Sequence, residues 1–218
     1  DKDRLTEIGR TLAGCPSDPR LGRMILQAHE EGSLSEIIII ASALAVQNPR
    51  LRPLDQAEAA DAAHRSYNDP RSDFLWYVNF WTAYHEQKES LSNNQLRKWC
   101  QRNFISFVRM REWIDTVRQM RDMARQDSLA MNDEPASYGA VHRALLAGQL
   151  SFVGRRTDDF VFTNPQGRQF NIFPGSVLFE KPPRWVVAAE IVETDKPYAR
   201  HVARVEPKWI ERLSQHIV

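Results

Sequence analysis

Apolar residues recur at intervals of three and four through the first two-thirds of the chain, a spacing typical of amphipathic helices. Further along, short runs alternate apolar and polar residues, as half-buried strands do. The predicted helices cover residues 5–12, 19–31, 34–46, 55–67, 73–88, a short segment after Ser92 that contains Trp99, 104–130 and 139–148.

Residues suited to helix ends flank several of these segments. Pro16 and Pro19 make the segment between the first two helices rigid, and Asp18 is a good N-cap with Pro19 at the first helical position. Gly32 is suited to end the second helix. The run from Ser33 to Glu36 reads as a capping box, and Ser72 and Ser92 are expected to cap the helices that follow them.

The last third of the chain is rich in β-branched and aromatic residues. Six segments alternate in polarity between turn signals: residues 151–155, 159–163, 168–173, 176–180, 185–193 and 199–205. A helix is expected over 207–216. Five or six short strands in so few residues fit a small OB-like barrel. The sequence therefore predicts an α+β chain, in which a helical bundle precedes a small OB-like β-barrel.

Composition excludes some function classes. The 218-residue chain has a net charge of +1, so binding of nucleic acid would depend on local clusters. Cys15 and Cys100 lie far apart in sequence and read as reduced thiols of a cytoplasmic protein. The apolar run Ile37–Val46 is too short to cross a bilayer, which needs about 20 residues, so no membrane partner is expected.

The chain lacks recognisable catalytic motifs. No Gly is followed by Lys, so there is no phosphate-binding P-loop, and neither an Asp-Glu-Ala-His box nor a GxSxG motif occurs. The six histidines are not spaced as metal ligands. We therefore expect no catalytic residue, metal or cofactor within this chain.

Two long segments carry opposite charge. Residues 97–125 hold eight basic and three acidic side chains, whereas residues 55–90 hold seven acidic and three basic ones. The simplest interpretation is that the two segments pair across the bundle, with helix pairs such as Arg111–Asp115 and Arg118–Asp122 absorbing some charge. The preference for arginine also suits phosphate contacts, which makes Arg97, Arg102 and Arg109 candidate nucleic-acid-binding residues.

A second basic set lies in the predicted barrel. OB-like barrels bind oligonucleotides at the loops between strands 1 and 2 and between strands 4 and 5. The candidate oligonucleotide-binding residues near turns of the barrel are Arg155, Arg156, Arg168, Lys181 and Arg184. Phe160 and Phe162 could add base stacking. For both phenylalanines we favour a position in the core. For Arg155, Arg156 and Arg168, contact with nucleic acid and a merely solubilising role are equally open.

Aromatic residues in the helical part are expected in the core. They form a broad apolar face between Phe74 and Tyr84, and Trp99, Trp113 and Trp185 are assigned to the core as well. Trp209 is expected to pack either on the barrel or on a neighbour outside the chain.

Several segments resemble a known family. Residues 5–24, LTEIGRTLAGCPSDPRLGRM, are similar to the "LTxLGRxxAxxPxDPRLxRM" junction of DEAH-box RNA helicases of the bacterial HrpA type. Residues 37–81 resemble that family's helicase-associated bundle, and 140–154 and 170–194 resemble its OB fold. One departure is Ser106, which stands where relatives commonly carry Asn.

The resemblance implies a domain order and a parent activity. It implies the end of a winged-helix domain at 1–17, a ratchet-like helical bundle at 18–131, and an OB-fold domain with leading and closing helices at 132–218. It implies RecA-like motor domains before Asp1, where ATP and Mg²⁺ would bind, and in long bacterial relatives a further region after Val218. The parent would then be an ATP-dependent RNA helicase moving 3′ to 5′ along a single strand.

Two functions from different classes follow. In the first, this accessory C-terminal region binds single-stranded RNA and closes a channel over it against the motor domains. In the second, it is a protein-interaction or regulatory module that docks on the motor, the ribosome, mRNA-associated proteins or an adaptor through the acidic segment 55–89. The sequence does not indicate the RNA target, the oligomeric state or whether DNA is also bound.

Overall fold

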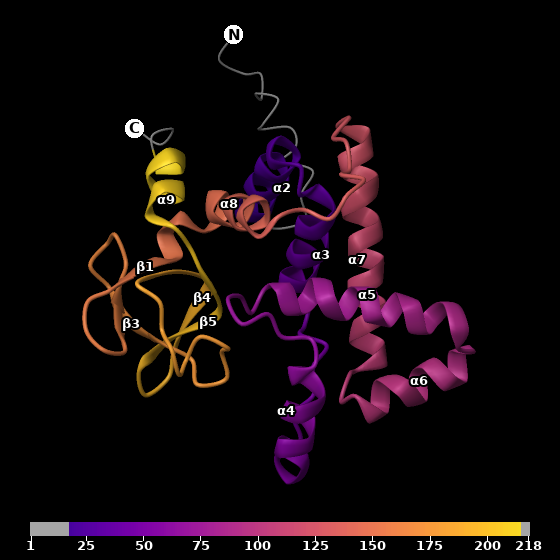
Figure 1. The fold of residues 1–218 in the computed structure, drawn as a ribbon. Coiled ribbons are helices and arrows are strands. Elements are labelled where there is room, and N and C mark those ends of the chain that lie inside the picture. Colours follow the sequence, from indigo (N-terminus) through magenta and orange to yellow (C-terminus); the bar gives the residue numbers. More distant parts are fainter. Residues whose placement is uncertain (1–17, 215–218) are drawn as a thin grey trace.

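The computed structural model describes residues 18–214, which form a helical bundle beside a small β-barrel (Figure 1). The bundle and the helix leading to the barrel comprise α2 (Pro19–Glu31), α3 (Leu34–Ala45), α4 (Ala57–Arg65), α5 (Leu75–Ser90), α6 (Asn93–Arg102), α7 (Phe107–Gln126) and α8 (Tyr138–Gln149). Short 3-10 turns, η1 (Leu54–Gln56) and η2 (Leu150–Phe152), precede α4 and the barrel. The expected helix at 5–12 lies outside the described residues.

Five strands close into a barrel in the order β1-β2-β3-β5-β4. Their bounds are β1 (Val153–Arg156), β2 (Val161–Thr163), β3 (Gln169–Ile172), β4 (Trp185–Glu193) and β5 (Pro197–Arg204), and α9 (Pro207–Ser214) follows them. Strands β3 and β5 are parallel, and the other neighbouring pairs are antiparallel. The predicted OB-like barrel is therefore confirmed.

Most predicted helices exist, and three predicted caps are confirmed. The Asp18 carboxylate accepts a hydrogen bond from the Arg20 backbone N–H at 2.9 Å, and Gly32 ends α2 with a left-handed φ of 64°. Ser92 and Gln95 form a reciprocal capping box at the start of α6. These caps use partners within a few residues, which a sequence pattern specifies directly.

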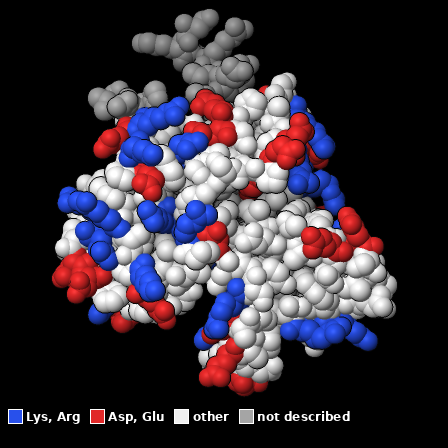
Figure 2. All heavy atoms as spheres, viewed as in Figure 1, with Lys and Arg blue, Asp and Glu red and all other residues white. Residues whose placement is uncertain are grey.

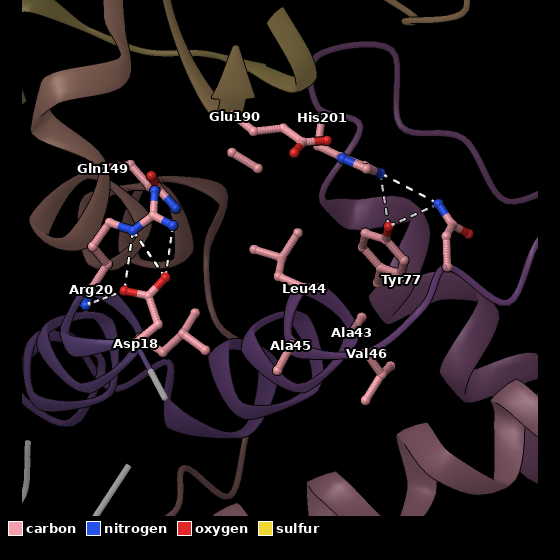
Figure 3. A pocket seen from close by; sticks show the side chains of 13 residues that line it. Asp18, Arg20, Ala43, Leu44, Ala45, Val46, Tyr77, Gln149, Glu190 and His201 are labelled. Atoms are coloured by element: carbon pink, nitrogen blue, oxygen red, sulfur yellow. Dashed lines mark hydrogen bonds and ion pairs between the residues drawn. The ribbon is translucent and has the colours of Figure 1, made fainter. Parts of the chain in front are cut away.

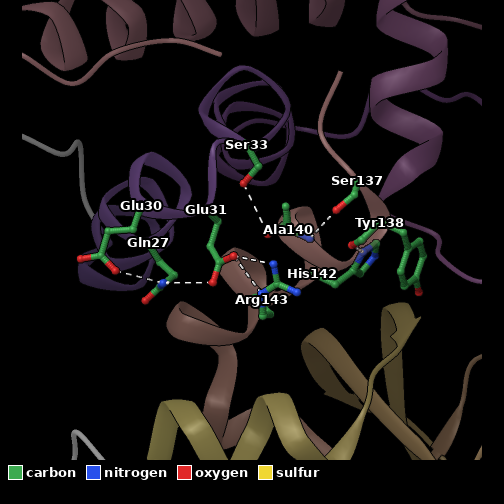
Figure 4. Close-up of polar contacts among 9 residues, drawn as sticks. All are labelled: Gln27, Glu30, Glu31, Ser33, Ser137, Tyr138, Ala140, His142 and Arg143. Carbon is green, nitrogen blue, oxygen red and sulfur yellow. Dashed lines mark hydrogen bonds and ion pairs between the residues drawn. The ribbon is translucent and has the colours of Figure 1, made fainter. Parts of the chain in front are cut away.

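Two other predicted caps are wrong, because long-range partners take their side chains. The Ser33 hydroxyl donates to the Ala140 carbonyl on α8 at 3.4 Å (Figure 4). The Glu36 carboxylate accepts from the Asn132 side chain and from the Ala136 backbone N–H. Ser72 is fully buried, and its hydroxyl lies 2.7 Å from Nε2 of His142 instead of capping α5. Helix α5 consequently begins later than expected, at Leu75.

Two predicted boundaries also differ. Residues 176–180 form turns instead of a strand, and they cover the barrel between β3 and β4. Helix α7 begins at Phe107 instead of 104, because Phe104 has a left-handed φ of 54° and Ser106 is the N-cap. The Ser106 hydroxyl accepts from the Arg109 backbone N–H at 3.3 Å, a role that Asn fills equally well.

The bundle and the barrel share one apolar core. Its bundle part includes Trp76, Phe80 and Trp113, as predicted for the aromatic face, and Val187 and Ala203 of the barrel belong to the same cluster. A second cluster around Phe162 and Phe170 fills the inside of the barrel. Trp99 and Trp185 are only partly buried at the edge of the main core. Trp209 packs toward α8, with Tyr138 at a ring distance of 6.5 Å.

Backbone contacts join bundle and barrel directly. The Asp73 carboxylate, just before α5, accepts hydrogen bonds from the backbone N–H of Val202 at 2.8 Å and of Val177 at 3.0 Å. The Tyr138 hydroxyl donates to the Arg204 carbonyl at 2.8 Å. The two parts are therefore held in one arrangement by polar contacts as well as by the shared core.

Candidate nucleic-acid interface

An aromatic groove lies on the barrel where an OB fold presents its loops. Phe160 comes from the β1–β2 loop, Lys196 from the β4–β5 loop and Tyr198 from the start of β5. With Asn171, Phe179 and others they line a groove of about 440 Å³. The Phe160 side chain is 51% exposed, so a flat aromatic face is open to solvent. Such a groove can stack unpaired bases.

Four of the five barrel candidates gather beside one another. Arg155 and Arg156 end β1, and the Arg156 guanidinium donates to the Pro182 carbonyl at 2.8 Å, which brings the segment carrying Lys181 and Arg184 alongside. The Arg155 guanidinium lies 6.0 Å from the Trp185 ring centre. All four charged side chains are exposed. On the face that Figure 2 shows, basic side chains gather over the barrel and along its border with the bundle.

The remaining candidates lie elsewhere. Arg168 forms an ion pair with Glu193, which lowers its availability for phosphate. Arg97 and Arg102 are on α6, at the end of the bundle far from the barrel (Figure 1). The Arg109 guanidinium donates to the Asn48 carbonyl at 3.0 Å and holds the loop after α3. The structure therefore does not unite the α6–α7 arginines with the barrel set.

The expected pairing between the acidic and basic segments is wrong. The ion pairs that involve residues 55–125 join residues close together in sequence: Arg52–Asp61, Arg71–Asp69, Arg118–Asp115 and Arg125–Asp122. The two on α7 are three residues apart, instead of the expected four. Exposed pairs of this kind contribute little stability, about 0–1 kcal/mol each.

Sequence reasoning assigned Phe160 to the core, and that prediction is wrong. Phe162 is fully buried as expected. Phe160 lies before the first residue of β2, so the alternation of buried and exposed side chains along that strand does not apply to it. Tyr198 and Lys196 were missed altogether. Their signal was their place beside the predicted turn at 195–197, because turn-flanking aromatics in an OB barrel fall near the ligand face.

A cleft between bundle and barrel is the second concave site (Figure 3). The Arg20 guanidinium binds both carboxylate oxygens of Asp18, with a shortest distance of 2.7 Å, and this contact lowers the Asp18 pKa. On the opposite wall, the Tyr77 hydroxyl lies 2.8 Å from Nε2 of His201. Burial, and then Arg50 and Arg200, lower the His201 pKa to about 3, so its imidazole is neutral.

The Ser72–His142 pair has a spacing seen in nucleophilic enzymes, yet it has a structural role here. Nδ1 of His142 lies 2.7 Å from the Tyr138 carbonyl, so it carries the proton, and Nε2 accepts from Ser72. Both side chains are fully buried, with no path to a substrate. Cys100 is buried as well, and burial raises its thiol pKa to about 11, which keeps it unreactive.

Residues 18–214 contain no group of three or more His, Cys, Asp or Glu side chains placed to hold a metal ion. No helix among them is both long and apolar enough to cross a membrane. The geometry of the described part thus centres on two concave surfaces, the barrel groove and the junction cleft.

Comparisons with known proteins agree with this architecture. Residues 18–106 match the ratchet-like helicase associated domain (HA2), and residues 141–217 match an oligonucleotide/oligosaccharide-binding (OB)-fold. The chain is 44% identical over 216 residues to the ATP-dependent RNA helicase HrpA of Escherichia coli (strain K12). The chain belongs to the HrpA-type helicase family. It carries the HA2 domain and the OB fold of that family, in the order predicted.

Other relatives set the extent of the likeness. The chain is 45% identical over 219 residues to the HrpA homolog of Haemophilus influenzae and 29% identical over 220 residues to human "probable ATP-dependent RNA helicase DHX35". At least 99% of the chain is covered in each comparison. The chain spans 17% of the length of each bacterial relative and 30% of the human one.

Proposed function

We propose that this HrpA-type region binds single-stranded RNA as the accessory part of an ATP-dependent DEAH-box helicase, and that it closes a channel over the strand against motor domains elsewhere in the protein. The observation that carries the proposal is the exposed aromatic groove between the two ligand-binding loops of a closed OB barrel, which also carries four exposed basic side chains. Stacking and phosphate contacts together are the usual basis of single-strand binding.

The division of labour within this interface follows from the chemistry. Phe160 and Tyr198 offer ring faces that accept any base, so they favour a single strand over a paired one. Arg155, Arg156 and Arg184 supply positive charge without an acidic partner among residues 18–214. Because these contacts read neither base edges nor sequence, we expect binding with little sequence preference.

The first test is the salt dependence of binding to a fluorescein-labelled single-stranded RNA, followed by fluorescence anisotropy. Phosphate contacts release counterions, so the logarithm of affinity falls with the logarithm of salt with a slope of about −0.7 per contact. We expect a slope of about −2 to −3 for the four basic residues. Affinity that does not change with salt would contradict the phosphate contacts.

The second test separates the two basic sets. Arg155→Ala with Arg156→Ala should weaken RNA binding and make the salt slope shallower by about 1 to 1.5, because two phosphate contacts are lost. Arg97→Ala with Arg102→Ala, on α6, is the matched control and should leave both quantities unchanged. The reverse result would move the site to residues 97–125.

The third test addresses stacking. Phe160→Ala should lower affinity about five- to tenfold or more, since stacking one base on an aromatic ring is worth about 1–3 kcal/mol. Leu54→Ala, which removes an apolar side chain that is 93% exposed in η1, controls for general loss of surface hydrophobicity. Equal effects of the two substitutions would rule out a stacking role for the groove.

A second candidate function rests on the arm formed by η1 and α4, which projects from the bundle (Figure 1). It carries exposed Leu54 and the acidic residues Asp55, Glu58 and Asp61. This combination fits docking to a basic protein surface, such as the motor, the ribosome or an adaptor. Recovery of one protein partner in a pull-down after nuclease treatment, and its loss on deletion of 54–65, would favour this function.

A further inference from the structure

The junction cleft holds unsatisfied hydrogen-bond acceptors. Its volume is about 490 Å³, within the range of small-molecule sites. Gln149, at the end of α8, is 2% exposed, and its side-chain oxygen has no hydrogen-bond partner among residues 18–214. A buried polar atom without a partner costs about 1–3 kcal/mol, so a group that donates to it would bind favourably.

A second acceptor faces the same space. Glu190 lies on β4, and its carboxylate points into the cleft between Gln149 and His201 (Figure 3). It forms no ion pair within the described chain. The Arg20 pKa is raised chiefly by the hydrogen bond with Asp18, and the charge of Glu190 adds to this in the same direction. Leu44 and Ala45, from the end of α3, form an apolar wall opposite these polar groups. The cleft therefore combines two free acceptors with an apolar face.

The surrounding charges select the kind of donor. The Arg50 guanidinium lies 3.3 Å from Nε2 of His201, and Arg200 also lowers the pKa of that imidazole. Asp18 is already neutralised by Arg20, so among residues 18–214 Glu190 is the only free carboxylate that lines the cleft. Neither Arg50 nor Arg200 lines the cleft itself. The Glu190 carboxylate and the Gln149 side-chain oxygen are both hydrogen-bond acceptors, so a ligand with neutral hydroxyl donors suits both.

We propose that this cleft binds one ribonucleotide unit of the RNA strand and receives its ribose hydroxyls on Gln149 and Glu190, so that the region distinguishes RNA from DNA. A ribonucleotide carries neutral hydroxyl donors for the two acceptors and a flat base for the apolar wall. The 2′-hydroxyl is the group that lets a protein tell RNA from DNA. This inference rests on the proposed RNA binding and adds a sugar-reading site at a distance from the barrel groove.

The test uses the whole chain and two single-stranded probes of about ten nucleotides with one sequence, as RNA and as DNA, in fluorescence anisotropy. Wild type should prefer RNA. Gln149→Met and Glu190→Ala should each lower RNA affinity about fivefold, the effect of one ordinary hydrogen bond, and leave DNA affinity unchanged. Glu86→Ala, on the exposed side of α5, is the charge-matched control and should change neither affinity.

A second variant tests the cleft without removing a polar group. Ala45 is exposed on the cleft wall, and Ala45→Trp should fill the space and abolish the preference for RNA. Ala59→Trp, at an exposed position of α4, is its control. Unchanged thermal unfolding of each variant shows that the fold is intact.

The outcomes separate this inference from the proposed function. If wild type binds neither probe, RNA binding itself fails. If wild type binds RNA and DNA equally, or if the cleft variants weaken both probes to the same extent, the sugar-reading site is wrong while RNA binding stands. A different outcome would assign the cleft to a cationic protein segment instead: an arginine-rich peptide binds wild type and not Glu190→Ala, while Glu190→Ala binds RNA as tightly as wild type.

Discussion

Two histidines at the contact between bundle and barrel show how burial sets chemistry at the residue scale. His142 is fully buried, and burial lowers its pKa to about 4. His201 occupies a left-handed φ of 51° in β5, which turns its imidazole toward Tyr77 and Asn48 of the bundle. Each imidazole accepts a hydrogen bond in its neutral form, so protonation would break a contact between the two parts.

These shifts predict that acid destabilises the protein. The unfolded chain binds a proton at each histidine below about pH 6.5, whereas the folded chain resists protonation down to about pH 4 at His142. The free energy of unfolding should therefore fall as pH drops through this window, by up to about 1.4 kcal/mol per pH unit for each histidine. Urea unfolding at several pH values measures the slope.

His142→Gln provides the comparison for that slope. It removes one titrating group, so the dependence of unfolding free energy on pH should become shallower between about pH 6.5 and pH 4. His29→Gln, at an exposed position of α2, has no buried contact to lose and should keep the wild-type slope. A slope that is insensitive to both substitutions would assign acid destabilisation to other groups.

The crossing of α2 and α8 is decided by one glycine at the element scale. A Cβ at Gly148 would lie 2.3 Å from the Arg20 carbonyl oxygen and 2.7 Å from Cγ of Met24. The helices can approach this closely only because position 148 has no side chain. The same approach places Arg20 and Gln149 on neighbouring walls of the junction cleft (Figure 3).

Gly148→Ala should consequently lower the free energy of unfolding by about 1–3 kcal/mol or more, because backbone must move to admit the methyl group. Gly139→Ala, in the same helix, meets chiefly the end of the flexible Arg143 side chain, at 2.9 Å, and should be tolerated. Chemical denaturation of both variants is the measurement. Equal effects of the two substitutions would contradict control by the crossing, because helix propensity alone favours Ala over Gly at both positions.

At the scale of the whole molecule, bundle and barrel form one packed unit. The apolar core is continuous across the junction, and the Asp73 carboxylate satisfies two barrel backbone N–H groups. A region built in this way holds the barrel groove and the junction cleft in a fixed relation, as a channel wall requires. Its two parts should unfold together.

Asp73→Ala tests this coupling. It leaves two buried N–H groups without partners and should cost about 1–3 kcal/mol for each. In the wild-type protein, two probes should follow the same single unfolding transition. They are tryptophan fluorescence, which reports mainly on the bundle, and far-ultraviolet circular dichroism, which reports on both parts. Two separate transitions in wild type would contradict a single cooperative unit. For the loss of stability in Asp73→Ala, the control is Asp133→Ala, in the linker.

The sequence by itself determined the helices, the barrel and the family likeness, because periodicity, caps such as Asp18 and Ser92, and turn residues act over a few neighbouring positions. Only the tertiary structure decided which side chains face solvent and which meet across the chain. Ser72 pairs with His142 at a separation of 70 residues, and Tyr77 with His201 at 124. The candidate arginines were nameable from sequence, but the exposed Phe160 and the junction cleft depend on how distant segments pack, which no local pattern records.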